Sequence, residues 1–468
     1  MKKRLISLIL AAIVLLSCAF AEESQSKEYL LPYIDLYAVP LGDNAIFEIP
    51  NEWGYQTSDA ADVPPMTSLL TDQNQMVMAM KLPADWEATE ASDALGIQSF
   101  MVEGTALMLG LTTPQSTRLQ EMTINDMPAV LVSMNGQGFD ILWVGDSGDL
   151  YFFLFPNDDD ALVRQMISVA QSLCVFHRKG EQVNPASDFA YTADGGEVTI
   201  TDYIGTSEHV LIPDAIDGLP VTALGHRAFY EKTVTTVVVP DSVTEIGAAC
   251  FSGDNYLVSL KLPDGLKRLP PASLESCMRL YDFDLPQSLE KIYSSVFEFN
   301  YYLTHLTLPS SLTEIEQQNF IGLYGLQSLT LAEDNAAFKL DETNGLLMTA
   351  DGTRLLHCFS DIVPAEEIIL PEGVKIVDPF AFHYDYDVKR IVLPEGVETI
   401  GAMAFAMCPN LTEIVIPASV TDIGAMDGLD GRTGIISYKH NVIVTPEGSS
   451  AWNWAVETGA TVKSPEEN

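Results

Sequence analysis

Proline recurs with a constant period along the second half of the chain. Neighbouring copies lie 23 residues apart, except in one interval of 62 residues: Pro240, Pro263, Pro286, Pro309, Pro371, Pro394 and Pro417. An apolar-x-apolar triplet precedes each proline, and in most copies apolar residues follow three, six and eleven positions later. One copy is too short to bury these side chains alone, so neighbouring copies must stack and share a core. The period therefore predicts a solenoid.

Each position in the repeat has a physical role. The alternation in the triplet puts Leu260 and Leu262 on one face of a short strand, with Ser259 and Lys261 on the other. Proline has no N–H to donate, so it ends the strand at once. We expect Phe297, eleven residues after its proline, to lie between adjacent turns. Stacked strands then form a parallel sheet along one side of the array.

The 62-residue interval contains an additional element. Ala332 takes the proline position, and the 39 residues that remain are one repeat plus 16. Within them, Asp351 and Gly352 separate two apolar runs, a pattern typical of a two-residue hairpin turn. We expect a hairpin near residues 340–360 that projects from the array.

Two stretches of the array carry a resemblance to a known family. Residues 243–251 are V-T-E-I-G-A-A-C-F, and residues 397–405 are V-E-T-I-G-A-M-A-F. Together with the entry segment 189–203 and the closing segment 448–460, they make residues 187–462 similar to the BspA-like leucine-rich repeat family of exported bacterial proteins. The resemblance implies adhesion to host or partner proteins, usually without catalysis.

The part of the chain before the repeats has a different pattern. We expect strands at residues 45–50, 76–82, 129–134, 139–144 and 150–155, and helices at residues 94–109 and about 157–176. This order predicts a compact α+β sandwich over residues 30–178. The phrase F-E-I-P-N-E-W at residues 47–53, followed by this order of elements, resembles PsbP-like domains.

These patterns predict a chain of several parts. We expect a signal peptide, an α+β domain, a linker, a leucine-rich repeat solenoid with its inserted hairpin, and a C-terminal cap and tail, at residues 1–21, 30–178, 179–188, 189–445 and 446–468.

The first residues favour export. Three basic residues precede an apolar run, 5–16, that is too short to span a bilayer. Ala19 and Ala21 form an A-x-A cleavage site. Alternatively, residues 15–18 resemble a bacterial lipobox, with Cys18 as the lipidated residue. No later run is long enough for a membrane helix.

The charge balance limits the class of partner. Asp and Glu number 65 against 24 Lys and Arg, a formal net charge of −41. Nucleic acid is excluded as a general partner, because binding it requires clustered basic residues. An extracellular protein or glycan is the partner that we expect.

No catalytic or metal site follows from the sequence. Residues 145–149, G-D-S-G-D, resemble the nucleophile segment of trypsin-like proteases, but no histidine precedes them to act as the base. We interpret the segment as a hairpin turn. The cysteines have no zinc spacing, and Cys277 and Cys408 share one repeat position, which favours interior packing. We expect no catalytic residue, cofactor or metal.

One candidate binding surface remains. The outward strand positions Ile369, Val392 and Val415 are apolar on successive turns, so they should form one contiguous stripe. Beside this stripe, a polar rim is expected: Glu367, Arg390 and Glu413. Plain β-propensity on a half-exposed strand also explains the stripe.

The sequence thus predicts an exported, non-catalytic leucine-rich repeat protein that mediates protein or glycan binding, or adhesion, at the bacterial cell surface. The alternatives are an envelope scaffold and a targeting module for an enzyme-like N-terminal domain.

Overall fold

The protein is described by a computed structural model. The description covers residues 36–41, 45–50, 53–58, 66–71, 75–82, 117–124, 127–134, 139–145, 150–156, 160–175, 182–360, 362–425, 435–436 and 441–466. Contacts divide the chain into two compact units, Met1–Gln182 and Val183–Asn468. Within the described ranges, no helix is both long enough and apolar enough to cross a bilayer.

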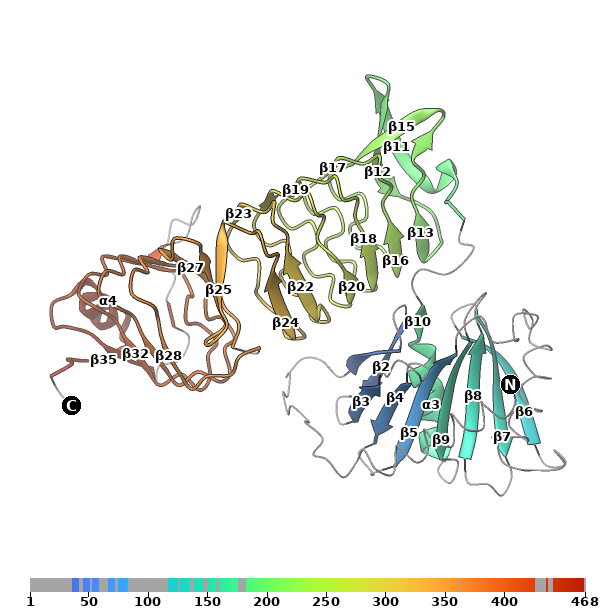
Figure 1. Ribbon diagram of the computed structural model, residues 1–468, viewed down its shortest axis with the longest axis horizontal. Coiled ribbons are helices and arrows are strands. Elements are labelled where there is room, and N and C mark those ends of the chain that lie inside the picture. Colours follow the sequence, from blue (N-terminus) through green and yellow to red (C-terminus); the bar gives the residue numbers. More distant parts are fainter. Residues whose placement is uncertain are drawn as a thin grey trace. The chain divides into compact units, whose positions relative to one another are not determined.

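The first unit is built on a seven-stranded antiparallel sheet (Figure 1). In spatial order its strands are β3 Gly54–Ser58, β4 Met66–Leu70, β5 Met76–Leu82, β9 Leu150–Pro156, β8 Phe139–Gly145, β7 Met127–Met134 and β6 Thr117–Ile124. A smaller sheet contains β1 Leu36–Pro40, β2 Ala45–Pro50 and β10 Cys174–Val175. Helix α3, Asp160–Gln171, and the smaller sheet share a hydrophobic core with the larger sheet.

The expected strands of this unit are confirmed as β2, β5, β7, β8 and β9. The helix expected to reach residue 176 is shorter, because α3 ends at Gln171 and Cys174–Val175 pair with β2 instead. Leu173 and Val175 are fully buried, and an extended backbone lets both reach the core. The helix expected at residues 94–109 lies outside the described residues. Strands β1, β3, β4 and β6 are not predicted by the sequence pattern.

The second unit begins with the antiparallel hairpin β11 Phe189–Asp194 and β12 Glu197–Tyr203, preceded by the short 3-10 helix η2 Ala186–Asp188. Strands β14 Ala215–Ile216 and β15 Leu219–Leu224 follow. Asn184 already belongs to this unit, since its side-chain oxygen accepts a 2.8 Å hydrogen bond from the backbone N–H of Leu211. The expected linker, 179–188, therefore overlaps the start of the array.

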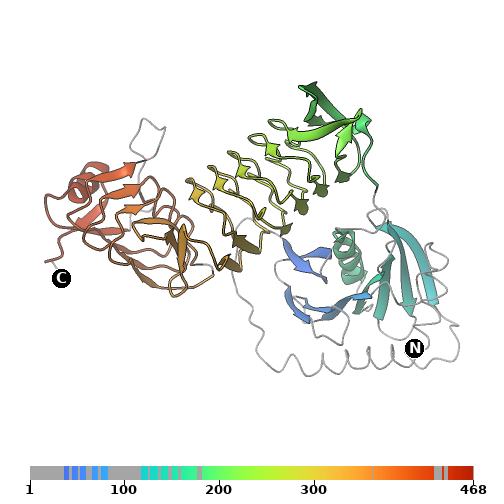
Figure 2. The ribbon, with the colours of Figure 1, turned by 45° about the horizontal axis from the view of Figure 1, so that its top comes forward.

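The array is a solenoid with two sets of parallel strands (Figure 2). The first set carries the triplets before the prolines: β13 His209–Leu211, β16 Thr236–Val238, β18 Ser259–Lys261, β20 Asp282–Phe283, β22 His305–Leu308, β24 Ser328–Leu331, β28 Glu367–Ile369, β30 Arg390–Val392, β32 Glu413–Val415, β34 Val442–Val444 and β35 Thr461–Lys463. The second set is not predicted by the sequence pattern: β17 Glu245–Ile246, β19 Arg268–Leu269, β21 Lys291–Ile292, β23 Glu314–Ile315, β29 Ile376–Val377, β31 Thr399–Gly401 and β33 Asp422–Ala425. Its strands hold the apolar residue six positions after proline.

The interior of the array is stacked as expected. Phe297 is fully buried, and the rings of Phe229 and Phe251, on adjacent turns, stack with centroids 5.2 Å apart. At the C-terminal end, helix α4 Ser450–Thr458 closes the core with the buried Trp454, and the Ser449 side chain caps the helix.

The inserted segment is present, but the expectation that it projects is wrong. Strand β25 Phe338–Asp341 pairs with β26 Leu346–Thr349, and β26 pairs with β27 Arg354–Cys358, all antiparallel. Strand β27 then pairs in parallel with β29, so the insert forms part of the second set of strands. Its side chains are apolar on both faces: Leu347 packs in the core of the preceding turns, while Leu346 packs in the core of the following turns. The insert therefore separates two hydrophobic cores. We call the turns before the insert the first section of the array and the turns after it the second section.

Candidate functional site

The expected apolar stripe is one row on the outer face of the second section. The backbone register places Ile369 beside Val392, and Val392 beside Val415. The residue before each of these three is fully buried, so the three side chains point outward: Ile368, Ile391 and Ile414. We call Ile369, Val392 and Val415 the apolar row.

The apolar row is open at one end. Ile369 is 58% exposed, while Val392 and Val415 are half-buried. Val444 continues the row beside Val415 but is only 5% exposed. Exposure thus decreases from β28 toward the C-terminal cap, and the β28 end offers the most apolar surface to a partner.

The three residues expected as a polar rim form a charged row beside the apolar row. Glu367 lies beside Arg390, and Arg390 lies beside Glu413. The Arg390 guanidinium forms ion pairs with both carboxylates, and its Nε donates to Glu413 Oε1 at 2.7 Å. Lys463 Nζ reaches Glu413 Oε2 at 2.9 Å. We call Glu367, Arg390 and Glu413 the charged row.

The charges of this row stabilise one another's ionised forms. Hydrogen bonds from Arg390 and Lys463 lower the pKa of Glu413, and hydrogen bonds to Glu413 and Glu367 raise the pKa of Arg390. Signs alternate from strand to strand, so the charged row is nearly neutral as a whole although the chain is strongly acidic. A strand added beside β28 would meet Glu367 first.

The outer face of the first section is polar from β18 onward, whereas Leu211 on β13 and Val238 on β16 are half-buried apolar residues at the repeat position of Val392. Thr307 and Thr330 share a hydrogen bond of 2.9 Å between their hydroxyl oxygens, and His305 is exposed. Ser259, expected on the outer face, is 2% exposed, because its hydroxyl donates a 2.6 Å hydrogen bond to Asp282. Ile369, 58% exposed, is the most exposed apolar residue of these outward positions, which makes the second section the better candidate for apolar recognition.

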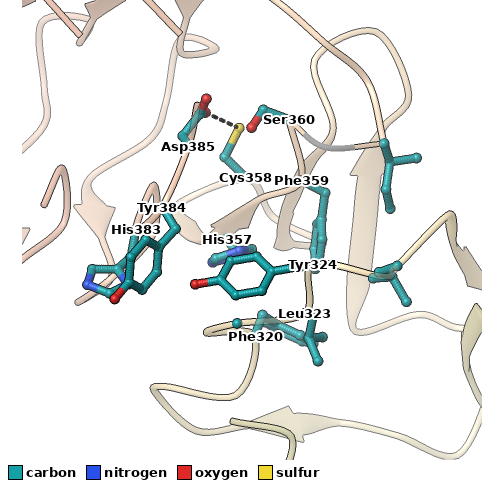
Figure 3. A pocket seen from close by; sticks show the side chains of 13 residues that line it. Phe320, Leu323, Tyr324, His357, Cys358, Phe359, Ser360, His383, Tyr384 and Asp385 are labelled. Carbon is teal, nitrogen blue, oxygen red and sulfur yellow. Dashed lines mark hydrogen bonds between the residues drawn. The ribbon is translucent and has the colours of Figure 1, made fainter. Parts of the chain in front are cut away.

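A hollow at the border between the sections is a second candidate (Figure 3). Cys358 Sγ lies 3.9 Å from Asp385 Oδ2, and the buried His357 ring packs against Phe320 and Phe359. Burial lowers the pKa of His357 to about 3 and raises that of Asp385 to about 6. The volume of the hollow is about 20 Å³, which is room for a water molecule and too small for an organic substrate. We interpret these side chains as packing.

The remaining sequence candidates do not form a site in the described residues. Cys18 and residues 146–149 lie outside them. Cys277 and Cys408 are buried as expected, and each thiol donates to a backbone carbonyl oxygen. No group of three His, Cys, Asp or Glu side chains in this part of the chain could hold a metal ion.

Two residues of the surface escape the sequence pattern. Val444 continues the apolar row beside Val415, and Lys463, which is in register beside Val444, reaches the charged row through its side chain. Both lie beyond Pro417, where the regular period ends, so only the backbone register and the ion pair with Glu413 place them there. No signal in the sequence gives their position.

Comparison with known proteins identifies the repeats. A model of the BspA type leucine rich repeat region matches residues 222–341 and 356–426 in six copies. Residues 222–341 and 356–426 of the array are BspA-type leucine-rich repeats. The resemblance found in its sequence motifs is thereby confirmed, and the match does not extend to residues 30–178. None of the curated proteins matches the chain.

Solved structures with a similarity to the chain include bacterial leucine-rich repeat proteins. The T. pallidum leucine-rich repeat protein is 26% identical, with 49% of this chain and 91% of that chain covered and a TM-score of 0.33. A leucine-rich repeat protein from Eubacterium ventriosum is 23% identical, with 55% and 69% covered and a TM-score of 0.42. A leucine-rich cell surface protein from Faecalibacterium prausnitzii is 19% identical, with 61% and 96% covered and a TM-score of 0.36.

Proposed function

We propose that the BspA-type array is the binding part of an exported, non-catalytic protein of the bacterial cell surface, and that the apolar row is its docking surface for an extracellular protein or glycan. The observation that carries the proposal is the exposure of Ile369, 58%, at the open end of a row continued by Val392 and Val415. Large apolar side chains that lie together on a surface are typical of interaction sites. The flanking charged row provides the polar rim that such sites have.

Export and attachment form part of the same proposal. The basic start and the apolar run 5–16 support export, and Cys18 supports a lipid anchor as one of two alternatives. The net charge of −41 keeps the partner outside the class of nucleic acids. The family of the repeats supports binding as the activity.

The test is capture by defined ligands after the row is made polar. Purified extracellular-matrix proteins and a glycan array serve as probes for the parent, for Val392→Asp, and for Val392→Asp/Val415→Asp. Because the substitutions lie on the outer face, we expect the melting temperature to stay within about 4 °C of the parent. Ligand capture should fall in the single variant and be lost in the double variant.

Lys261→Asp is the matched control, because Lys261 is exposed at the same repeat position of the first section. It should capture ligand as the parent does. Unchanged capture by the folded double variant would contradict the assignment of the row. If no probe retains the parent protein, the envelope scaffold becomes the better account.

A further inference from the structure

Strand β28 is the first strand of its sheet and has an unpaired edge. The sheet runs β28-β30-β32-β34-β35, while the preceding triplet strands form the sheets β13-β16-β18-β20 and β22-β24. The first set is thus interrupted between β20 and β22 and between β24 and β28. Only at the second interruption does the inserted segment β25-β26-β27 lie between the strands in sequence, and it adds strands to the second set alone.

The backbone groups on this edge are identifiable. Strand β28 uses the carbonyl of Glu366 and the N–H of Leu370 toward β30, with the bonds Arg390 N to Glu366 O at 3.0 Å and Leu370 N to Val392 O at 2.9 Å. In a parallel ladder, alternate residues point their peptide groups to opposite sides, so those of Glu367 and Ile369 face away from β30. Among the described residues, no strand pairs with these two on that side. An edge of this kind is a template for another strand.

The side chains on this edge select a partner. On the outer face, the Glu367 side chain is 49% exposed and binds Arg390 on one side only. Glu413, in contrast, lies between two cations, Arg390 and Lys463. A basic residue on an added strand would complete the alternation of charges at Glu367. An aliphatic residue two positions later would lie beside Ile369 and extend the apolar row.

We propose that the edge of β28 binds an extended segment of another protein as an added parallel strand, with a basic residue beside Glu367 and an aliphatic residue beside Ile369. This inference rests on the proposed function, because it uses the open end of the same apolar row. Main-chain hydrogen bonds provide the affinity, and the alternate side chains provide the specificity. Strand β24 is a weaker candidate, since its outward residues, Ser328 and Thr330, carry no charge to select a partner.

The probe is a capped, fluorescent peptide Lys-Thr-Val-Thr-Lys-Thr-Val, titrated with the full chain and followed by fluorescence anisotropy. Its Lys and Val residues stand in the register of Glu367 and Ile369, so its Thr residues carry the peptide groups that face β28. N-methylation of the Thr residues should lower the affinity at least roughly tenfold, because it removes these hydrogen bonds. The same number of N-methyl groups on Lys and Val residues should leave binding unchanged. Equal loss from both methylated peptides would overturn the strand register.

Charge reversal at Glu367 tests whether this side chain selects a basic residue on the added strand. Glu367→Lys should weaken the Lys peptide roughly tenfold and bind the matching Glu peptide better than the parent does. Glu395→Lys is the control, because it makes the same change of net charge at an exposed position after β30. If the two variants change the affinity equally, the peptide responds only to the net charge of the protein, and the assignment to Glu367 is wrong.

Two further experiments test the direction of the added strand and whether a second copy of the chain, rather than another protein, occupies the edge of β28. A peptide of reversed sequence that binds as well as the probe would overturn the parallel direction. A dimer of the chain that dissociates on Ile369→Pro would assign the edge to a second copy and overturn the peptide proposal. Proline is tolerated at an edge where its missing N–H faces away from the sheet, so this variant should fold.

The two proposals fail separately. If the peptide does not bind while Val392→Asp/Val415→Asp still abolishes ligand capture, only the edge assignment is wrong. If the peptide binds at Glu367 while the row variants capture ligand normally, the apolar row is not the docking surface and the edge remains.

Discussion

The repeat position three residues after the buried Phe favours a hydrogen-bond donor. Asn300 Nδ2 donates to Leu274 O at 3.0 Å, and Cys277 Sγ donates to Phe251 O at 3.1 Å. Asp254 occupies the same position and is fully buried; its Oδ1 accepts a hydrogen bond from Tyr256 N, and its Oδ2 has no hydrogen-bond partner. An ionised carboxylate cannot donate, but a protonated one can. Burial accordingly raises the pKa of Asp254 to about 8.

Asp254→Asn tests this protonation. The folded pKa lies above the ordinary value of 3.8, so the proton stabilises the fold fully below about pH 4 and this stabilisation is lost as the pH rises through about 8. Asparagine donates at every pH. We expect the variant to be more stable than the parent at pH 9, with a smaller advantage at pH 5, in thermal unfolding followed by circular dichroism. Asp264→Asn, at an exposed position, is the control. Identical pH dependence in Asp254→Asn and the parent would contradict a protonated Asp254.

Much at this scale follows from the sequence. Position counting identifies which residues are interior, because Cys277, Asn300 and Cys408 recur in step with proline. The protonation of Asp254 does not follow, since it depends on desolvation by neighbouring turns. The gradient of exposure from Ile369 to Val444 does not follow either, because Val444 and the strand beside it, β35, are outside the regular period.

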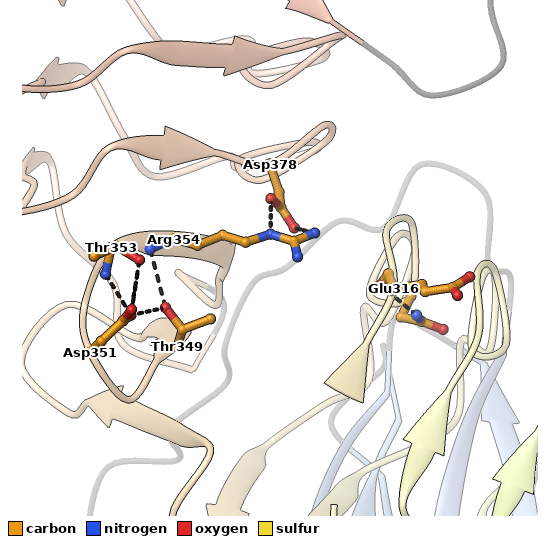
Figure 4. A network of polar contacts seen from close by, with 7 residues as sticks. Glu316, Thr349, Asp351, Thr353, Arg354 and Asp378 are labelled. Atoms are coloured by element: carbon orange, nitrogen blue, oxygen red, sulfur yellow. Dashed lines mark hydrogen bonds and ion pairs between the residues drawn. The ribbon is translucent and has the colours of Figure 1, made fainter. Parts of the chain in front are cut away.

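At the scale of elements, a bidentate ion pair adds to the backbone pairing between the inserted segment and the next turn (Figure 4). Arg354 on β27 donates to Asp378 through Nε at 2.6 Å and through an Nη at 2.9 Å. The Asp378 side chain is only 4% exposed. Burial raises the pKa of this carboxyl, and Arg354 partly offsets the increase. The pair therefore links strand β27 of the insert to the end of β29, the next strand of the second set.

Arg354→Met should destabilise the array strongly. The substitution leaves Asp378 buried without its cation, and breaking such a pair costs roughly 3 kcal/mol of unfolding free energy. The measurement is urea unfolding at pH 7, where the carboxyl would otherwise be charged. Lys267→Met is the control, because the pair of Lys267 with Glu290 is exposed and should contribute little. Similar losses in the two variants would show that the buried pair has no special role.

The sequence predicts the elements unevenly. The hairpin turn at Asp351 and Gly352 is predicted because Asp-Gly is specific for such turns. The sequence-based prediction that this hairpin projects was wrong. The run Leu346, Leu347, Met348 is apolar on both faces of the strand, and such a strand needs packing partners on both faces, which the second set of strands provides. The two-residue strands of that set are too short to show a period of two, so only the stacked backbone reveals them.

At the scale of the whole molecule, the described residues form three hydrophobic cores, which share the stability of the fold. One lies in the first unit, and the other two lie on either side of the inserted segment in the array. In a repeat array each turn contacts mainly its neighbours, so a local loss spreads along the array and fades with distance. The sequence predicts a change of architecture after about residue 178, because the period of proline begins only later. The division of the array into two cores is not predicted, since it depends on which face of the insert meets which turn.

Phe297→Ala tests this division. Phe297 is fully buried in the first section of the array, and truncation of a buried Phe costs about 3–5 kcal/mol. Hydrogen exchange followed by mass spectrometry should show lost protection in the neighbouring turns, a smaller loss beyond the inserted segment, and none in the first unit. Tyr256→Ala is the control, because Tyr256 is 50% exposed and its removal should change protection little. The division is wrong if strands β2, β5 and β9 of the first unit lose protection together with the turns around Phe297, because their core contains no residue of the array.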